Sequence, residues 1–169
     1  MLNPSLAPTL RTVHLHSDSP SATARFGERL ARHLRPGDII LLAGDLGAGK
    51  TCFSQGIGRG LRVAEAVKSS SFVLVNEYHG RLTVYHADLF RLSDPAEIAE
   101  LALEETSRDG VLLVEWPDRA WDEMPDESLL VHFAITGDRT RQLRLEARGG
   151  RYEELLGSLE QSLAPRKKG

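Results

Sequence analysis

Two short apolar runs without alternation stand out along the chain. Residues 39–43 read Ile-Ile-Leu-Leu-Ala, and residues 111–114 read Val-Leu-Leu-Val. A strand covered on both faces of a parallel sheet shows such a run, whereas a strand with one face in water alternates between apolar and polar positions. The two runs therefore predict buried parallel strands at the centre of a sheet.

Shorter apolar segments predict the remaining strands. Gly80-Arg81 separates two strand-like segments and predicts a hairpin, and Thr136-Gly137-Asp138 predicts a turn between two others. The segments predicted to form these strands are residues 12–16, 72–79, 82–86, 129–135 and 142–147.

Helical spacing and capping residues predict four helices. Ser19-Pro20 supplies a cap and a proline at the first helical position, and Asp94-Pro95-Ala96-Glu97 adds a glutamate at the third. Glycines at 56, 58 and 60 are poor helix formers, so we interpret them as close packing against the sheet or as a frayed end. The predicted helices are residues 20–34, 50–61, 95–105 and 152–163.

The order of these elements predicts an α/β fold in a single domain. Strands alternate with helices, which is typical of a mostly parallel central sheet flanked by helices, here with antiparallel edge strands. The 169 residues match one domain in length and contain no repeat, linker or low-complexity segment. We predict one domain over residues 1–165, and we interpret residues 166–169 as a basic, mobile tail.

Composition and charge favour a cytoplasmic protein without direct affinity for nucleic acid or membranes. The net charge is −3 and the isoelectric point is about 6.1, so no overall attraction to polyanions is expected. The single cysteine, Cys52, excludes an internal disulfide and fits a reducing compartment. The first residues lack the pattern of a signal peptide, and no apolar run approaches the roughly 20 residues of a membrane helix.

The sequence GDLGAGKT, residues 44–51, directly follows the first apolar run. It matches the phosphate-binding pattern G-x-x-x-x-G-K-[ST], in which glycines let backbone N–H groups approach an anion. A helix that begins at Lys50 would direct the positive end of its dipole at the phosphates. We expect Lys50 to reach the β and γ phosphates and the Thr51 hydroxyl to bind Mg²⁺, which predicts nucleotide binding and a P-loop NTPase fold.

Two carboxylates at the ends of strand segments are candidates for the rest of the site. Glu115 ends the run 111–114, and Asp88 follows the segment that ends at His86. The carboxyl ends of parallel strands line the ligand crevice, so with a phosphate loop these residues fit a pair that binds metal and positions water. Each taken singly also fits an ordinary surface carboxylate. The six histidines lack the spacing of metal ligands, so we interpret them as strand or surface residues, and Cys52 as a small buried residue.

Four motifs in order make the chain resemble a known family. GDLGAGKT (44–51), SSSFVLVNEY (69–78), YHADLFRL (85–92) and EWPDR (115–119) are similar to motifs of the bacterial P-loop ATPases of tRNA threonylcarbamoyladenosine biosynthesis, the TsaE (YjeE) family. The resemblance implies a Mg²⁺-dependent ATPase subunit that acts with the TsaB and TsaD proteins. Their product is N6-threonylcarbamoyladenosine at adenosine 37 of tRNAs that read ANN codons. ATP and Mg²⁺ are the implied cofactors, and tRNA is an indirect partner that is bound through the complex.

The resemblance also implies roles for individual residues. Ser71 matches a threonine of a switch-like segment, Trp116 the tryptophan beside the catalytic glutamate, and Arg141 an arginine near the nucleotide. Ser70 replaces the usual proline and frees the backbone there, while Ser71 keeps the hydroxyl. The implied catalytic residues are Glu115, Asp88 and Lys50, and the implied metal ligands are Thr51, Glu115 and Asp88. The implied nucleotide contacts are Asp45, Leu46, Gly47, Ala48, Gly49, Lys50, Thr51, Ser71, Trp116 and Arg141.

Two other functions remain open from the residues alone. A small-molecule kinase uses the same loop with an arginine-bearing lid, which the arginines at 139, 141, 144 and 148 imitate, although they alternate within an apparent strand. A nucleotide-dependent switch would bind the nucleotide without needing to hydrolyse it. The chain contains no N-K-x-D motif, which argues against a guanine-selective GTPase.

Overall fold

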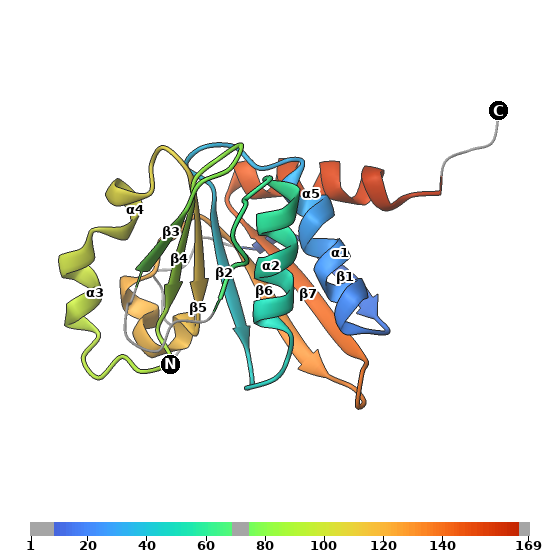
Figure 1. Cartoon of the computed structure of the whole chain (residues 1–169), viewed down its shortest axis with the longest axis horizontal. Coiled ribbons are helices and arrows are strands. Elements are labelled where there is room, and N and C mark those ends of the chain that lie inside the picture. The colour runs from blue at the N-terminus through green and yellow to red at the C-terminus, as the bar shows by residue number, and fades with distance from the viewer. Residues whose placement is uncertain (1–8, 69–74, 166–169) are drawn as a thin grey trace.

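A computed structural model describes residues 9–68 and 75–165 of the chain. Within these residues, one sheet of seven strands forms the centre of the molecule, in the order β1-β7-β6-β2-β5-β4-β3 (Figure 1). The strands are β1 (Thr9–Ser17), β2 (Ile39–Gly44), β3 (Val75–Tyr78), β4 (Val84–Asp88), β5 (Val111–Glu115), β6 (Ser128–Ile135) and β7 (Arg141–Arg148). The helices are α1 (Pro20–Ala31), α2 (Lys50–Gly60), α3 (Ala96–Leu101), α4 (Leu103–Thr106), the 3₁₀ helix η1 (Pro117–Glu123) and α5 (Gly150–Leu163).

The centre of the sheet is parallel and its edges are antiparallel. Strand β2 pairs in parallel with β5 and with β6, and β4 pairs in parallel with β5. Strand β3 is antiparallel to β4, and β7 is antiparallel to both β6 and β1. The predicted α/β fold with a mostly parallel centre and antiparallel edge strands is therefore confirmed, and both predicted hairpins are present.

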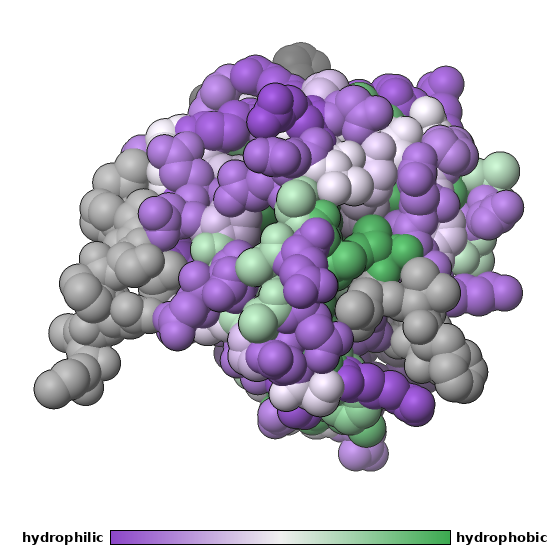
Figure 2. Space-filling view, turned by 90° about the vertical axis from the view of Figure 1, so that its left-hand side faces the viewer, coloured by the Kyte–Doolittle hydropathy of each residue, from purple (hydrophilic) through white to green (hydrophobic). Residues whose placement is uncertain are grey.

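Strand β2 carries alternate residues into two apolar clusters. Ile40 and Leu42 belong to the cluster that lies under α1, α2 and α5. Ile39 and Leu41 belong to the cluster on the other side of the sheet, under α3, α4 and η1. On that second side, a few apolar residues lie within a mostly hydrophilic surface (Figure 2). Both faces of β2 are covered, as its unbroken apolar run predicts.

Helix α1 begins as its sequence predicts, and it packs closely against α2. The Ser19 hydroxyl accepts a hydrogen bond from the backbone N–H of Ala22, with Pro20 in the first turn. A Cβ atom at Gly56 of α2 would lie only 1.9 Å from the carbonyl oxygen of Ala24. At Gly60 it would lie 2.5 Å from the Ala31 Cβ. The interpretation of the three glycines as close packing is right, but the partner is not the sheet: Gly56 and Gly60 pack against α1, and Gly58 packs against Val67.

The predicted helix over residues 95–105 is wrong as a continuous element. It is divided into α3 and α4 at Ala102, which has a left-handed backbone with φ of 45°. Ile98 and Leu103 are five residues apart. In one regular helix their side chains would point about 140° apart around the helix axis, so both could not face the sheet. The break lets both side chains enter the same apolar cluster. The short helix η1 was not predicted from the sequence either.

Candidate functional site

The segment between β2 and α2 forms a loop at the carboxyl edge of the sheet. Gly47 and Gly49 have φ of 76° and 107°, a left-handed backbone that favours glycine. A Cβ atom at Gly47 would meet nothing within 4 Å, so the loop is open on that side. Helix α2 begins at Lys50, directly after Gly49. This geometry suits an anion held by backbone N–H groups at a helix N-terminus.

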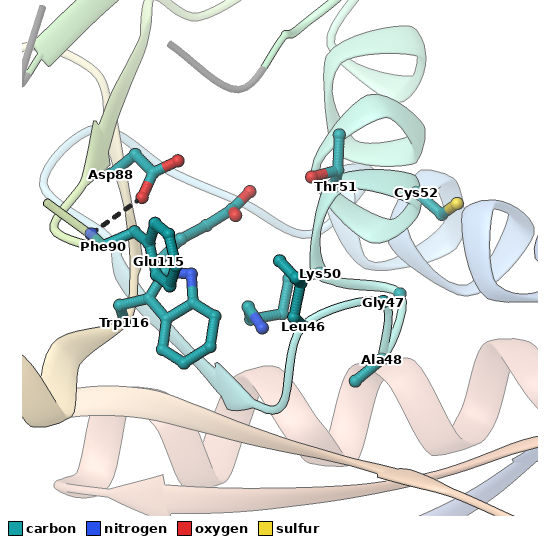
Figure 3. Close-up of a pocket in the computed structure, with 11 residues that line it drawn as sticks. Leu46, Gly47, Ala48, Lys50, Thr51, Cys52, Asp88, Phe90, Glu115 and Trp116 are labelled. Carbon is teal, nitrogen blue, oxygen red and sulfur yellow. Dashed lines mark hydrogen bonds between the residues drawn. The ribbon is translucent and has the colours of Figure 1, made fainter. Parts of the chain in front are cut away.

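A pocket of about 220 Å³ lies between this loop and the ends of β4 and β5 (Figure 3). Its lining combines the loop, the start of α2, both predicted carboxylates and two aromatic side chains. Most of the residues predicted to bind nucleotide or metal therefore lie together around one pocket. The lining residues are Leu46, Gly47, Ala48, Gly49, Lys50, Thr51, Cys52, Asp88, Phe90, Glu115 and Trp116.

The Lys50 ammonium is bonded to its own loop. Lys50 is only 5% exposed, and its Nζ donates to the backbone carbonyls of Gly44 and Asp45. The same atom lies 4.0 Å from the centre of the Trp116 ring, a cation–π contact. Burial lowers the pKa of Lys50 from its ordinary value, and the nearby carboxylates, Glu115 first among them, oppose that shift. The loop thus holds a desolvated cation beside the space where phosphates would bind.

Asp88 and Glu115 are direct neighbours in the register of β4 and β5. Asp88 is 9% exposed and Glu115 is 2% exposed, and Asp88 Oδ1 accepts a hydrogen bond from the backbone N–H of Phe90. In Figure 3 the Glu115 carboxylate lies between Asp88 and the Thr51 hydroxyl. The parallel register therefore explains how two carboxylates 27 positions apart in sequence reach the same pocket.

The donor set of the pocket fits Mg²⁺. The ion prefers hard oxygen ligands and usually keeps several waters and phosphate oxygens, so one hydroxyl and two carboxylates suffice on the protein side. Thr51, Asp88 and Glu115 supply these groups. No group of three or more His, Cys, Asp or Glu suited to a metal occurs among the described residues.

Aromatic residues form one wall of the pocket. Trp116 directly follows β5 with φ of 60°, and this left-handed backbone turns the chain into η1. Its ring lies 4.9 Å from that of Phe90, and the Arg119 guanidinium lies 5.5 Å from the Phe90 ring. Leu46 of the loop also lines the pocket and is 75% exposed. Trp116 was predicted to lie at the site, whereas Phe90 and Arg119 were not.

The Arg141 side chain contacts the backbone of the loop. The guanidinium donates to the carbonyl oxygens of Gly47 at 3.0 Å, Gly137 at 2.9 Å and Thr140 at 2.8 Å. Arg141 therefore links the loop to the turn between β6 and β7, and its predicted contact with the nucleotide stays a prediction. Arg144 and Arg148 lie within β7 rather than on a separate lid, so the arrangement expected of a small-molecule kinase is not seen in the described residues.

Sequence reasoning missed two residues that contact Glu115. His86 Nε2 lies 3.0 Å from Glu115 Oε1, and the Ser54 hydroxyl lies 3.4 Å from the same oxygen. His86 is a strand residue, as interpreted, but it is bonded to a candidate catalytic carboxylate. Its place two residues before Asp88, and so on the same face of β4, was the available signal. Cys52 is partly exposed and lines the pocket, so its interpretation as a buried residue is wrong.

Three predicted features lie wholly or partly outside the described residues. Ser71 and the start of the strand predicted over residues 72–79 fall within residues 69–74, and the basic tail is residues 166–169. Within the part of the chain that is described, no helix has the length and apolar character to cross a membrane.

Comparisons with known proteins agree with this fold. The family model for "Threonylcarbamoyl adenosine biosynthesis protein TsaE" matches residues 17–143. The tRNA threonylcarbamoyladenosine biosynthesis protein TsaE of Bacillus subtilis is 38% identical over 143 residues, which cover 83% of this chain and 89% of that protein. The protein of the same name from Treponema pallidum is 36% identical and covers 75% of this chain and 95% of its own. The crystal structure of YdiB from Bacillus subtilis has a TM-score of 0.77 at 32% identity, over 91% of this chain and 97% of that one.

The matched region contains the parts that build the pocket. It begins at the end of β1 and ends within β7, so it includes the loop, both carboxylates and Arg141. The resemblance predicted from the four sequence motifs is therefore confirmed, and the chain belongs to the TsaE family of tRNA threonylcarbamoyladenosine biosynthesis proteins.

Proposed function

We propose that this protein is a Mg²⁺-dependent ATPase subunit that drives threonylcarbamoyl modification of adenosine in tRNA, together with the TsaB and TsaD proteins. Membership of the TsaE family supports the pathway. The observation that supports the chemistry is the meeting of Lys50, Thr51, Asp88 and Glu115 around one pocket of about 220 Å³. The proposal implies action in the cytoplasm, where tRNA is modified.

The loop and the start of α2 would bind the phosphates of ATP. Backbone N–H groups from Gly47 to Thr51 surround the anion, and the helix dipole adds positive potential. Lys50 exchanges its bonds to the loop carbonyls for bonds to the β and γ phosphates. Magnesium, held by Thr51 and an acidic residue, would neutralise charge on the phosphate oxygens.

The two carboxylates would have different roles in hydrolysis. Glu115 is buried and directed into the pocket, where it can orient the attacking water and accept its proton. Asp88 is already bonded to the N–H of Phe90, so its position is fixed by the turn that follows β4. We assign the main catalytic role to Glu115 and a supporting role at the metal to Asp88.

The isolated protein should turn over ATP slowly. Among the described residues, the arginines nearest the pocket are engaged elsewhere: Arg141 with backbone carbonyls and Arg119 with aromatic rings. Other phosphate-loop enzymes receive the missing cation from a partner, with gains of roughly 10³ or more in rate. The TsaB–TsaD complex would supply such a cation here and so stimulate ATP turnover.

The test is ATP turnover by the protein alone and with TsaB, TsaD and tRNA. Partner-dependent turnover and formation of threonylcarbamoyladenosine in the tRNA are expected, and Glu115→Ala should reduce both about 100-fold or more. Glu153→Ala, in the first turn of α5 and away from the pocket, is the control that should retain wild-type turnover. Fast turnover by the isolated protein, unchanged by partners, contradicts the proposal. Transfer of phosphate to a small molecule would instead support a kinase.

A further inference from the structure

His86 and Glu115 lie diagonally across two neighbouring parallel strands. His86 pairs with Leu113 in the register of β4 and β5, so Glu115 is two positions further along the same face. The side chains of His86 and Glu115 are only 0% and 3% exposed, and their bond is 3.0 Å long. Glu115 lines the pocket and His86 does not. The bond therefore lies behind the pocket, inside the protein.

A second donor reaches the same oxygen from α2. Ser54 lies one helical turn after Lys50, is fully buried, and donates its hydroxyl hydrogen to Glu115 Oε1. Oε1 thus accepts hydrogen bonds from two different elements of the fold. Oε2 is the oxygen that remains for ligands in the pocket, and the two bonds to Oε1 restrict rotation of the carboxylate.

The second ring nitrogen of His86 indicates where its proton resides. His86 Nδ1 is buried and has no hydrogen-bond partner among the described residues. A buried N–H group without an acceptor is costly, whereas a proton on Nε2 is donated directly to Glu115. The tautomer with its proton on Nε2 therefore suits this environment, and it directs the donor of His86 at Glu115.

We propose that His86, assisted by Ser54, is a positioning residue that holds Oε1 of Glu115 so that Oε2 faces the nucleotide and its metal. This inference rests on the proposed function. His86 contacts neither the phosphates nor the metal in this scheme and acts only through Glu115. Without His86, the carboxylate is free to turn toward the Lys50 ammonium, whose charge attracts it.

The kinetic test compares two substitutions of His86 in the full protein with its partners. His86→Leu fills a similar volume without a donor and should lower kcat about 10- to 100-fold, as loss of a residue that orients a metal ligand typically does. The KM for ATP should stay within about threefold, because phosphate binding is left intact. His86→Gln can place an amide N–H near the same oxygen and should recover most of kcat. His132→Leu removes a strand histidine that faces Glu146 outside the pocket and should behave as wild type.

The variants also separate positioning from mere support of the fold. A loss of kcat that is equal in His86→Leu and His86→Gln overturns the proposal, and so does an unchanged kcat in His86→Leu. A rise in KM with unchanged kcat would likewise overturn it, since that places the role in binding. A urea unfolding curve for each variant identifies any that fails to fold. For that case, NMR of the protein with His86 intact provides a second test.

The second readout needs neither ATP nor Mg²⁺. Nitrogen-15 NMR of the ligand-free protein should show His86 protonated at Nε2, and Glu115→Gln should shift that signal while leaving His132 unchanged. A His86 signal that is insensitive to Glu115→Gln overturns the inference. If the wild-type complex instead shows no ATP turnover, only the proposed function is contradicted, because the NMR result still decides whether His86 donates to Glu115.

Discussion

Replacing Gly56 with alanine tests the close contact between α1 and α2. The added Cβ atom would lie 1.9 Å from the Ala24 carbonyl oxygen and 2.7 Å from its carbonyl carbon. Non-bonded heavy atoms prefer separations of about 3.5 Å, so the helices would have to move apart by about 1.5 Å. Both contacting atoms belong to the backbone of α1, which cannot turn aside as a flexible side chain would. We therefore expect Gly56→Ala to destabilise the protein.

The expected magnitude follows from two opposing contributions. Overpacking typically costs about 1–3 kcal/mol, and a clash with backbone belongs at the upper end of that range. Alanine recovers about 1 kcal/mol of helix propensity relative to glycine. The net loss should be about 2 kcal/mol. With a typical urea dependence of about 2 kcal/mol per molar, the unfolding midpoint should fall by about 1 M.

The assay is urea unfolding followed by circular dichroism, with Gly150→Ala as the matched control. Gly150 also lies in a helix, but a Cβ atom there meets nothing within 4 Å. Its replacement should leave the midpoint unchanged or raise it slightly. If the midpoints of the two variants coincide, or if Gly56→Ala is the more stable protein, the reasoning from helix contact is refuted. Because α2 carries Lys50 and Thr51, the destabilised variant should also bind ATP more weakly.

Three further substitutions address the loop and the core. Lys50→Ala should lower ATP turnover about 100-fold or more, because it removes the side-chain cation expected at the β and γ phosphates; turnover close to wild type in a phosphate-release assay would exclude the assigned role. Arg141→Ala removes a bond to the Gly47 carbonyl and should weaken ATP binding about 2- to 10-fold by calorimetry, and an unchanged affinity would contradict a bracing role. Tyr152→Phe leaves the buried Ile39 N–H without its acceptor and should cost about 1–3 kcal/mol in urea unfolding, with turnover unchanged. Since burial raises the pKa of Tyr152 to about 12, its contribution to stability is present below pH 10 and is lost as the pH rises through 12, a loss that Tyr152→Phe should reduce.

Local sequence signals predicted the elements that build the pocket. The apolar runs of β2 and β5 and the glycine-rich loop are short, continuous patterns, and each was correctly placed on its strand or helix. The pairing of Asp88 with Glu115 could be anticipated because both end strands whose carboxyl ends share one edge of the sheet. These predictions depended on chemistry within a few residues of each position.

The features that were missed depend on contacts between distant parts of the chain. The break at Ala102 exists because Ile98 and Leu103 must both meet the sheet, which no capping residue signals. The partner of Gly56 is Ala24, 32 positions away in the chain, and only the folded helix pair reveals it. The bond between His86 and Glu115 requires the register of β4 against β5. The spacing of His86 and Asp88 puts both residues on one face of β4, but only the register shows that His86 reaches Glu115.

The bonds from Lys50 to the loop carbonyls have a consequence for how the protein would recognise its ligand. The ammonium has already left bulk water and is coordinated by Gly44, Asp45 and the Trp116 ring. Phosphate binding would therefore be a substitution reaction at Lys50, in which one set of acceptors replaces another, and much of the dehydration has been completed during folding. The carbonyl oxygens of Gly44 and Asp45 therefore compete with the nucleotide phosphates for the Lys50 ammonium. Affinity is then set by the difference between two occupied states of the same cation rather than by the strength of the phosphate contact alone.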